Sequence, residues 1–318
     1  MPTKRSPRKG SLQFWPRKRA KKFLPSTNWN AIKSDSSKGL KGFICYKAGM
    51  VSASVLDNTS NSQTKGKNIA IPCTFLECPT LRIFSVRFYK NSKVVKEILS
   101  ENLEKELKKK VKISKPKKHS LENINSNDYE DIKVIVYSQV KKTQIKKTPD
   151  LSEIGLKGEV SEKLNFVKEN INKEISVLDF FKKGQLVDFR GLTRGRGLQG
   201  PVKRFGITLK SHKSEKGRRR PGSLGPWHPA RVTFRVPQAG QLGMFTRVIY
   251  NSKIIDIGKS ENKEMLKNLK KFGNIKTDYV LVGGSVQGPS KRQLLLTDVL
   301  RPSKIQLKKN YEFLGVLK

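Results

Sequence analysis

The sequence predicts a mostly β protein that carries an inserted α+β region and two long basic extensions. Strand-like runs occur on both sides of a middle region with helical periodicity, which indicates one β-barrel interrupted by an insertion. Two basic segments rich in glycine or proline lack the apolar periodicity of a packed element. We therefore expect four parts: a basic N-terminal arm at 1–38, the β-barrel at 39–90 and 184–318, a central loop at about 194–231, and an inserted α+β domain at 91–183.

Three runs in the first part of the chain have the composition of β-strands. Gly42–Tyr46, Ile69–Phe75 and Arg82–Phe88 combine alternation with β-branched or aromatic side chains. Ser60–Gly66 is polar and predicts a turn. These runs form the first half of the expected barrel.

The middle region has a different pattern. Ser92–Lys110 carries apolar residues at helical spacing and predicts an amphipathic helix, as does Glu162–Glu174. Ile132–Val140 predicts a strand between them. Both charge signs are mixed here, so we expect a solvated face rather than the main contact with nucleic acid.

The last third returns to strands. Asn251 and Ser252 predict a hairpin turn between two of them, and the Gly283-Gly284 and Gly288-Pro289 pairs predict further turns. The expected strands are Val232–Val236, Thr246–Ile249, Lys253–Ile257, Asp278–Val282 and Gln293–Asp298.

The charge points to a polyanionic partner. Lys and Arg number 67 against 26 Asp and Glu in 318 residues, a formal net charge of +41. Such a chain repels itself unless an anion neutralises it, and nucleic acid is the first candidate, ahead of an anionic membrane surface and of acidic proteins. No apolar stretch approaches the roughly 20 residues that span a bilayer, and no secretory signal follows the N-terminus, so we expect a cytoplasmic protein.

The N-terminal arm contains no acidic residue from Met1 to Ser34. Four prolines break any long helix, while Phe14, Trp15 and Trp29 are interleaved with the basic side chains. We expect the arm to thread between RNA helices, with aromatic side chains stacked on bases. The alternative is a solvated, disordered tail.

The segment from Arg190 to Arg235 is basic, rich in glycine and long for a loop, with Glu215 as its only acid. Its Pro221–Gln238 part places Trp227 and His228 between Arg218–Arg220 and Arg231. A tryptophan on a rigid loop among guanidinium groups suits insertion into folded RNA. A buried core tryptophan beneath a proline-rich turn is an equally open alternative.

Enzyme motifs fail on their context. Gly195–Gly200 matches the GxGxxG pattern, but Pro201 follows at once and Arg218–Arg220 stand where an acidic ribose ligand is required. Gly258–Ser260 resembles the end of a phosphate-binding loop, but the first glycine of that loop is required at position 253, which is Lys253. Three histidines and three cysteines form no recognisable catalytic or zinc pattern, so we expect reduced structural cysteines and no cofactor or metal. Two rivals stay open: an RNA-modifying transferase with a basic channel, and a DNA-binding chromatin protein.

Several segments, in order along the chain, resemble the universal ribosomal protein L-three family. The arm resembles that of its archaeal and eukaryotic branch, and the absence of the longer eukaryotic C-terminal extension favours an archaeal source. The segments are Pro7–Ala20 (PRKGSLQFWPRKRA), Gly184–Phe189 (GQLVDF), Gly191–Gly206 (GLTRGRGLQGPVKRFG), Pro221–Val232 (PGSLGPWHPARV) and Gln238–Gly243 (QAGQLG).

The resemblance implies a translation-factor-like β-barrel and a non-enzymatic role in the large ribosomal subunit. It implies binding to large-subunit rRNA beside neighbouring ribosomal proteins, a part in early assembly, and proximity to tRNA and elongation factors, with no membrane or DNA partner. Trp227 matches the tip of a loop that approaches the peptidyl-transferase centre. The expected RNA-binding residues are Lys4, Arg5, Arg8, Lys9, Arg17, Lys18, Arg19, Arg194, Arg196, Lys203, Arg204, Lys210, His212, Lys213, Arg218, Arg219, Arg220, Trp227, His228 and Arg231.

Overall fold

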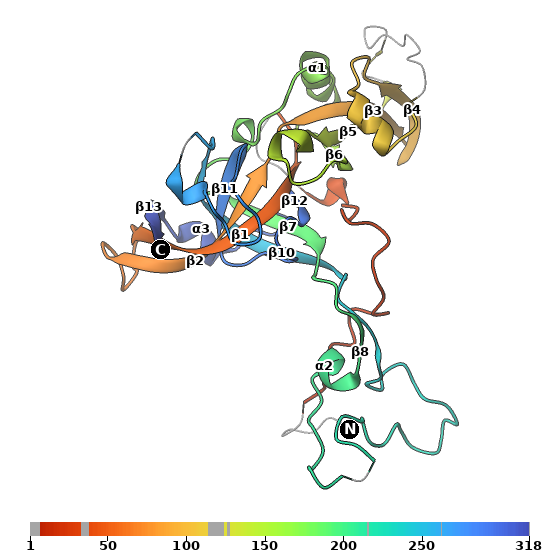
Figure 1. Ribbon diagram of the computed structural model, residues 1–318. Coiled ribbons are helices and arrows are strands. Elements are labelled where there is room, and N and C mark those ends of the chain that lie inside the picture. The colour runs from red at the N-terminus through yellow and green to blue at the C-terminus, as the bar shows by residue number, and fades with distance from the viewer. Residues whose placement is uncertain are drawn as a thin grey trace. The chain divides into compact units, whose positions relative to one another are not determined.

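The computed structural model describes residues 7–32, 38–113, 124–125, 128–214, 216–261 and 263–317. The chain divides into two compact units. Leu24–Gly191 and Val248–Lys318 form the first, called here the core unit, and Met1–Phe23 and Leu192–Arg247 form the second, called the basic unit. The protein is mostly β, as the sequence predicts (Figure 1).

The largest sheet has seven strands in the order β12-β7-β10-β11-β2-β1-β13. Its strands are β1 (Gly42–Asp57), β2 (Asn68–Cys78), β7 (Leu186–Leu192), β10 (Thr246–Gly258), β11 (Asp278–Gly283), β12 (Gln293–Asp298) and β13 (Tyr311–Leu317). The runs predicted at Gly42–Tyr46 and Ile69–Phe75 are confirmed as parts of β1 and β2, and those at Asp278–Val282 and Gln293–Asp298 as β11 and β12.

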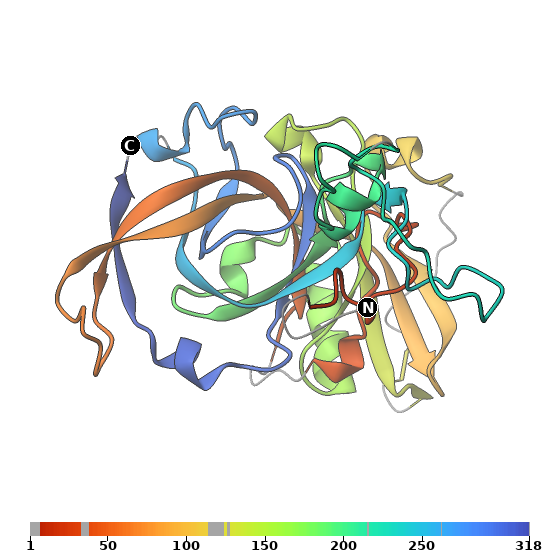
Figure 2. The same ribbon diagram turned by 90° about the horizontal axis from the view of Figure 1, so that it is seen from below.

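The pairings of this sheet run in a closed ring. β12 pairs with β7 at one end of the order and also with β1, where Phe43 lies opposite Leu296. Only β13 then lies outside the ring, on the free edge of β1. The course of the strands around this ring can be followed in Figure 2.

A second sheet of four strands has the order β4-β3-β5-β6. Its members are β3 (Leu81–Lys90), β4 (Lys93–Leu99), β5 (Asp131–Ser138) and β6 (Leu151–Gly155). The strand predicted at Ile132–Val140 is therefore confirmed. The Arg82–Phe88 run is a strand too, but it was expected in the barrel with β1 and β2, and it pairs instead with β4 and β5.

The amphipathic helix predicted at Ser92–Lys110 is wrong. Lys93–Leu99 is strand β4, and only Lys105–Lys109 is helical, as a short 3-10 turn (η2). Asn91 and Ser92 both have positive φ, 50° and 59°, which is the geometry of a two-residue hairpin turn. The hairpin pairs Val86 with Ile98. Backbone pairing with β3 across this turn, with Ile98 as the buried side chain of β4, overrides the helical spacing.

The helix predicted at Glu162–Glu174 is confirmed as α1 (Val160–Asn170). Leu164 and Val167 are buried on its apolar stripe, and the Glu162 carboxylate accepts the Glu159 backbone N–H at 3.2 Å. The remaining helical elements are short: η1 (Trp29–Ala31), η4 (Val140–Thr143), η5 (Val177–Asp179), α2 (Pro201–Phe205), η6 (Glu264–Leu266) and α3 (Lys304–Lys308).

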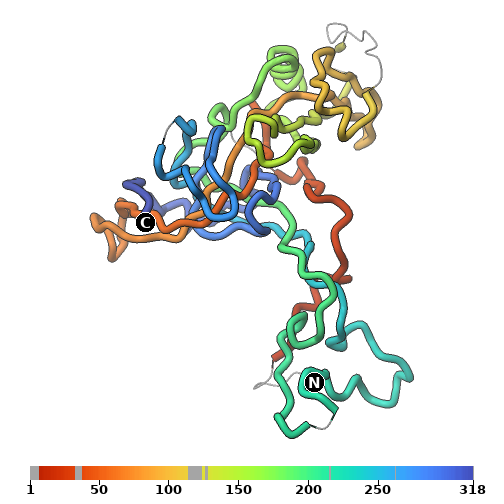
Figure 3. The backbone as a smooth tube through the Cα atoms, in the orientation of Figure 1, coloured from red at the N-terminus to blue at the C-terminus, as the bar shows by residue number. Residues whose placement is uncertain are grey.

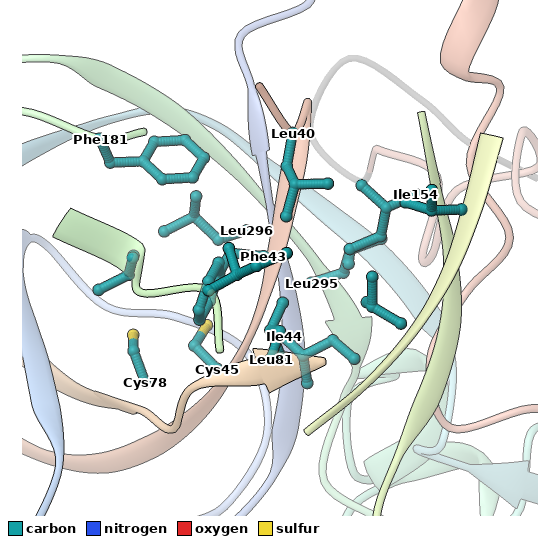
Figure 4. Close-up of a cluster of buried hydrophobic side chains, with 14 of the residues drawn as sticks. Leu40, Phe43, Ile44, Cys45, Cys78, Leu81, Ile154, Phe181, Leu295 and Leu296 are labelled. Carbon is teal, nitrogen blue, oxygen red and sulfur yellow. The ribbon is translucent and has the colours of Figure 1, made fainter. Parts of the chain in front are cut away.

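The largest hydrophobic cluster contains side chains from both sheets. Phe43, Ile44 and Leu295 come from the large sheet and Ile154 from the small one, and Figure 4 shows them together. Each such fully buried side chain stabilises the fold by about 1.5–3 kcal/mol. The cysteines are free and buried, as expected of structural cysteines, and Figure 4 shows Cys45 beside Cys78.

Two predictions for the last third are wrong. Thr246–Ile249 and Lys253–Ile257 are not separated by a hairpin, because β10 runs through both. Asn251 has a φ of 57° inside that strand, and its backbone N–H donates to the Asp188 carboxylate at 2.9 Å. Asn251 and Ser252, which favour turns, thus occupy an irregular position within one continuous strand.

The strand predicted at Val232–Val236 is absent from the described structure of that segment. Phe234 instead packs on the N-terminal arm, as described below, and Pro229 and Pro237 flank the run. No helix in the described part of the chain is long and apolar enough to cross a bilayer.

Candidate nucleic-acid interface

The basic unit begins with a two-stranded stem. β8 (Gly197–Gln199) pairs antiparallel with β9 (Gly240–Leu242). Outside these strands, the Thr193 N–H donates to the Phe245 carbonyl at 3.0 Å. Gly243 is required here: its φ is +80°, and a Cβ would lie 2.0 Å from the Arg194 carbonyl oxygen. Glycine at 243 therefore permits the close approach of the two backbones at Arg194.

A short helix, α2 (Pro201–Phe205), continues the stem. Proline stands in its first turn, and Gly206 ends it in the left-handed region with a φ of 69°. From this helix Arg204 reaches across the stem and donates to the carbonyls of Gln238 and Gln241 at 3.0 Å, and to that of Arg17 at 3.3 Å. Arg204 thus binds both sides of the stem and the arm.

The N-terminal arm also donates a hydrogen bond to α2. Arg17 donates to the Arg204 carbonyl at 2.8 Å, and its guanidinium carbon lies 4.1 Å from the centre of the Phe205 ring. Trp15 stacks on Phe205 with ring centres 6.2 Å apart and meets Phe234 edge-on at 5.3 Å. Three aromatic rings and one guanidinium therefore form a small cluster within this unit, in which Phe205 is buried, Trp15 is partly buried and Phe234 is exposed.

Burial lowers the pKa of Arg17, and repulsion from Arg204, Arg247 and Arg8 lowers it further. Burial alone lowers the pKa of Arg204. Both groups remain cationic at neutral pH, because the ordinary value is 12.5. Their positive charge is thus directed at backbone carbonyls of the same unit.

Two further contacts fasten the arm. The Ala20 N–H donates to the Met244 carbonyl at 2.9 Å, and the Arg8 guanidinium donates to the Arg235 carbonyl. After Phe23 the chain enters the core unit, where Leu24, Trp29 and Ile32 are buried. Trp29 donates its indole N–H to the Glu153 carbonyl at 3.1 Å. The expectation that Trp29 stacks on bases is wrong, because the ring is 3% exposed in a hydrophobic cluster.

The distal loop, residues 207–236, is mostly exposed to solvent, and its course can be followed in Figure 3. Its backbone hydrogen bonds are local, such as the one from the Lys210 N–H to the Arg218 carbonyl at 3.1 Å. Trp227 is 87% exposed. This exposure removes the alternative of a core tryptophan beneath a proline-rich turn.

The basic unit is almost without acid. Met1–Phe23 contains nine Lys and Arg residues and Leu192–Arg247 contains thirteen, against the single acid Glu215. In the core unit, by contrast, carboxylates are available to pair with some of the cations, as buried Lys157 pairs with Asp298 at 2.9 Å. Because its cations have almost no carboxylate available, the basic unit keeps its charge for an external anion.

The predicted site residues separate into two groups. Arg8, Lys9, Arg17 and Arg204 are partly buried, and three of these four bind backbone carbonyls of their own unit. Lys4 and Arg5 lie outside the described residues. The exposed residues are Lys18, Arg19, Arg194, Arg196, Lys203, Lys210, His212, Lys213, Arg218, Arg219, Arg220, Trp227, His228 and Arg231.

Sequence reasoning missed three residues that organise this unit: Phe205, Phe234 and Arg247. The Arg247 guanidinium carbon lies 5.1 Å from the centre of the Phe14 ring and 5.4 Å from that of Phe245. The sequence did contain a signal for them, namely isolated aromatic residues in otherwise polar, basic segments. Such residues need a packing partner to leave water.

Among the described residues, no group of His, Cys, Asp and Glu could hold a metal ion. The unit instead carries exposed cations, the exposed Trp227 indole and a small aromatic cluster. A β fold with such a cationic extension defines a class common among proteins that assemble with nucleic acid.

The comparisons with known proteins identify the family. A family model described as Ribosomal protein L3 matches residues 1–312. The large ribosomal subunit protein uL3 of Archaeoglobus fulgidus is 38% identical over 309 residues, which cover 94% of this chain and 93% of its own. Those of Methanococcus vannielii and Methanobrevibacter smithii are 38% and 39% identical, over 94% and 93% of this chain and 93% and 92% of theirs.

The chain therefore belongs to the ribosomal protein L3 family, as the resemblance of its motifs predicted. These relatives are archaeal, and they are named as proteins of the large ribosomal subunit. The protein is accordingly a structural ribosomal protein and not an enzyme.

Proposed function

We propose that this chain is a structural constituent of the cytoplasmic large ribosomal subunit that binds large-subunit rRNA through its basic unit. The observation that carries the proposal is the charge of that unit, which contains twenty-two Lys and Arg residues and one acidic residue. Most of the described site cations are exposed. Its relatives, named for the large subunit, support the same assignment.

The exposed arginines and lysines contact phosphates rather than base edges. Guanidinium groups bind phosphate oxygens in pairs, and each neutralised phosphate releases a counterion, so affinity falls as salt rises. Such contacts position the RNA without reading its sequence. The partly buried Arg17 and Arg204 hold the arm and the stem together, so that the exposed cations are presented on an ordered scaffold.

The distal loop carries Trp227 toward the peptidyl-transferase centre. Support comes from the 87% exposure of its indole and from the match of Pro221–Val232 to the family's loop tip. An exposed ring of this size stacks readily on an unpaired base. In this position the loop influences the accommodation of aminoacyl-tRNA, and elongation factors dock nearby.

The core unit anchors this extension. We interpret the closed ring of β1, β2, β7, β10, β11 and β12 as the β-barrel, and the four-stranded sheet with α1 as the inserted domain. The surface of the β-barrel then remains for rRNA and for neighbouring ribosomal proteins. In this interpretation the protein joins rRNA helices early in subunit assembly.

The proposal is tested with a variant in which Arg218, Arg219 and Arg220 are all alanine. The three side chains are exposed, so the isolated protein should keep its free energy of unfolding within about 0.5 kcal/mol per substitution. Its association with large ribosomal subunits, measured by co-sedimentation over a salt series, should weaken and show a smaller salt dependence. A matched control replaces Lys108, Lys109 and Lys110 of the core unit by alanine and should bind as the unaltered protein does.

Normal subunit assembly and translation in the arginine variant would contradict the proposal. Thermal stabilisation by S-adenosylmethionine would favour an RNA-modifying enzyme instead. Preferential binding to duplex DNA over rRNA at the same salt concentration would favour a chromatin protein.

A further inference from the structure

A groove of about 390 Å³ lies within the basic unit, between the N-terminal arm and the strand that follows β9. Residues 13–21 line one side and residues 245–247 the other. The hydrogen bond from the Ala20 N–H to the Met244 carbonyl, 2.9 Å long, fixes the two sides beside each other. The groove is therefore a built feature of the unit, and no residue of the distal loop lines it, although Phe234 packs against Trp15.

Aromatic rings and guanidinium groups alternate along this groove. The Arg247 guanidinium carbon stands 5.1 Å from the centre of the Phe14 ring and 5.4 Å from that of Phe245. Arg17 stands 5.5 Å from the ring of Trp15. Phe14 is 58% exposed, although a large apolar ring gains free energy by leaving water. The Arg247 guanidinium lies over this ring, but none of the aromatic pairs among the described residues includes Phe14, so the rest of the ring is available for stacking.

The lining is cationic. It contains no acidic residue, and its cations are Arg17, Lys18, Arg19, Lys21 and Arg247. The complementary ligand is therefore an anion that also carries a planar apolar face. A nucleotide has both properties, and the volume of the groove falls in the range of about 300–1,000 Å³ typical of small-ligand sites. An acidic peptide would neutralise the cations but would leave the Phe14 ring uncovered.

We infer that this groove binds one unpaired nucleotide of RNA, with the base stacked on Phe14 and the adjoining phosphates held by Arg19 and Arg247. The inference rests on the proposed rRNA-binding function and names a ligand for one part of the basic unit. It assigns the arm a base-stacking role in addition to phosphate contact. A stacking site tolerates any base, because every base presents a π face.

The test uses two single strands of ten residues and equal charge: decauridylate, and an abasic ribose-phosphate strand. The full chain carries Trp227→Ala in every sample, so that the loop tip adds no stacking. Binding is measured by fluorescence anisotropy of the labelled strands. The chain with Phe14 should prefer decauridylate, and Phe14→Ala should weaken decauridylate binding roughly fivefold or more while leaving abasic binding unchanged.

Two further variants and one crosslink sharpen the result. Phe14→Tyr keeps the ring and should keep the preference, and Leu12→Ala removes an exposed apolar side chain outside the groove and should change neither affinity. Irradiation of a strand with 5-iodouridine should crosslink Phe14. Equal affinity for both strands with Phe14 present, or no effect of Phe14→Ala, would overturn the nucleotide site while rRNA binding stands. Failure of the unaltered chain to bind rRNA would instead overturn the proposed function.

Discussion

The three tryptophans of this chain have three different surroundings. Trp29 is 3% exposed in the core unit, Trp15 is partly buried among Phe205, Phe234 and Arg17, and Trp227 is 87% exposed. Composition cannot distinguish them, because all three stand near basic and proline residues. Their neighbours in space determine whether the indole stabilises the fold or remains available for a ligand.

Alanine substitution should separate these roles. Trp29→Ala leaves a cavity and removes the indole hydrogen bond to the Glu153 carbonyl, so we expect the free energy of unfolding to fall by about 3–5 kcal/mol. Trp227→Ala should change it by no more than about 0.5 kcal/mol and should weaken rRNA binding or alter tRNA accommodation. Urea unfolding and a translation assay measure the two effects. A Trp227→Ala protein that unfolds in isolation would show that this ring is structural.

Glu77 is a buried carboxylate whose environment favours its protonated form. Burial raises its pKa to about 7, although the N–H groups of Lys276 and Thr277 donate to Oε1 at 2.8 and 3.2 Å and lower it in part. Oε2 is buried without a hydrogen-bond partner. A carboxyl group with a proton on Oε2 avoids burying a charge in this position.

The pH dependence of stability follows from this raised value. Between pH 4.5 and about 7 the folded state binds the Glu77 proton more tightly than the unfolded state, so stability falls as pH rises and the loss is complete above about 7. The loss is on the order of 3 kcal/mol. Glu77→Gln should therefore stabilise the protein more at pH 8 than at pH 5, as measured by urea unfolding. An equal effect at both pH values would contradict this account of Glu77.

At the scale of elements, the arm and the stem depend on Arg204. One guanidinium donates to three carbonyls from two segments, Arg17 in the arm and Gln238 and Gln241 in the stem. Lysine has a single donor centre and cannot reproduce this geometry. The arm, the stem and α2 thus form one cooperative structure with a small aromatic cluster.

Arg204→Ala should release the arm while the core unit stays folded. We expect the Ala20 amide, which donates to Met244, to exchange with solvent at least tenfold faster, and Arg204→Lys should not restore it. Amides of β12 should be unaffected. Lys203→Ala is the matched control, because Lys203 is exposed on the same helix. An unchanged exchange rate at Ala20 in the Arg204→Ala protein would show that other contacts hold the arm.

Strands could be predicted where alternation or β-branched content agreed with the final pairing, as for Gln293–Asp298. Prediction failed where partners far away in sequence decide the outcome. The Lys93–Leu99 run has helical spacing, yet it pairs with β3 across a turn of Asn91 and Ser92, which was the overlooked signal. The Val232–Val236 run alternates but forms no strand, and Phe234 instead meets Trp15 edge-on, a contact that only the fold reveals.

At the scale of the whole molecule, charge is divided between the two units rather than spread evenly. The core unit pairs some of its cations with carboxylates, whereas the basic unit contains only Glu215. This division was visible in the sequence as one stretch without acidic residues and one with Glu215 alone. The sequence did not show which cations hold the unit together and which are exposed. Arg17 and Arg204 differ from Arg19 and Lys203 in what they contact.

The distal loop, residues 207–236, has few backbone hydrogen bonds, and those are local. Apolar burial is also scarce there, since the loop's side chains are mostly exposed. Segments with these properties open at low free energy in the isolated protein. An anionic partner that neutralises the cations would remove their mutual repulsion and supply the missing contacts.

Hydrogen exchange of residues 207–236, compared between the purified chain and the chain bound to large-subunit rRNA, tests this most directly. We expect these amides to exchange rapidly in the free protein and to become protected in the complex, while the amides of β1, β2 and β12 stay protected in both. Strong protection of the loop without RNA, unchanged on binding, would contradict the account, because the loop would then be stabilised by its own protein.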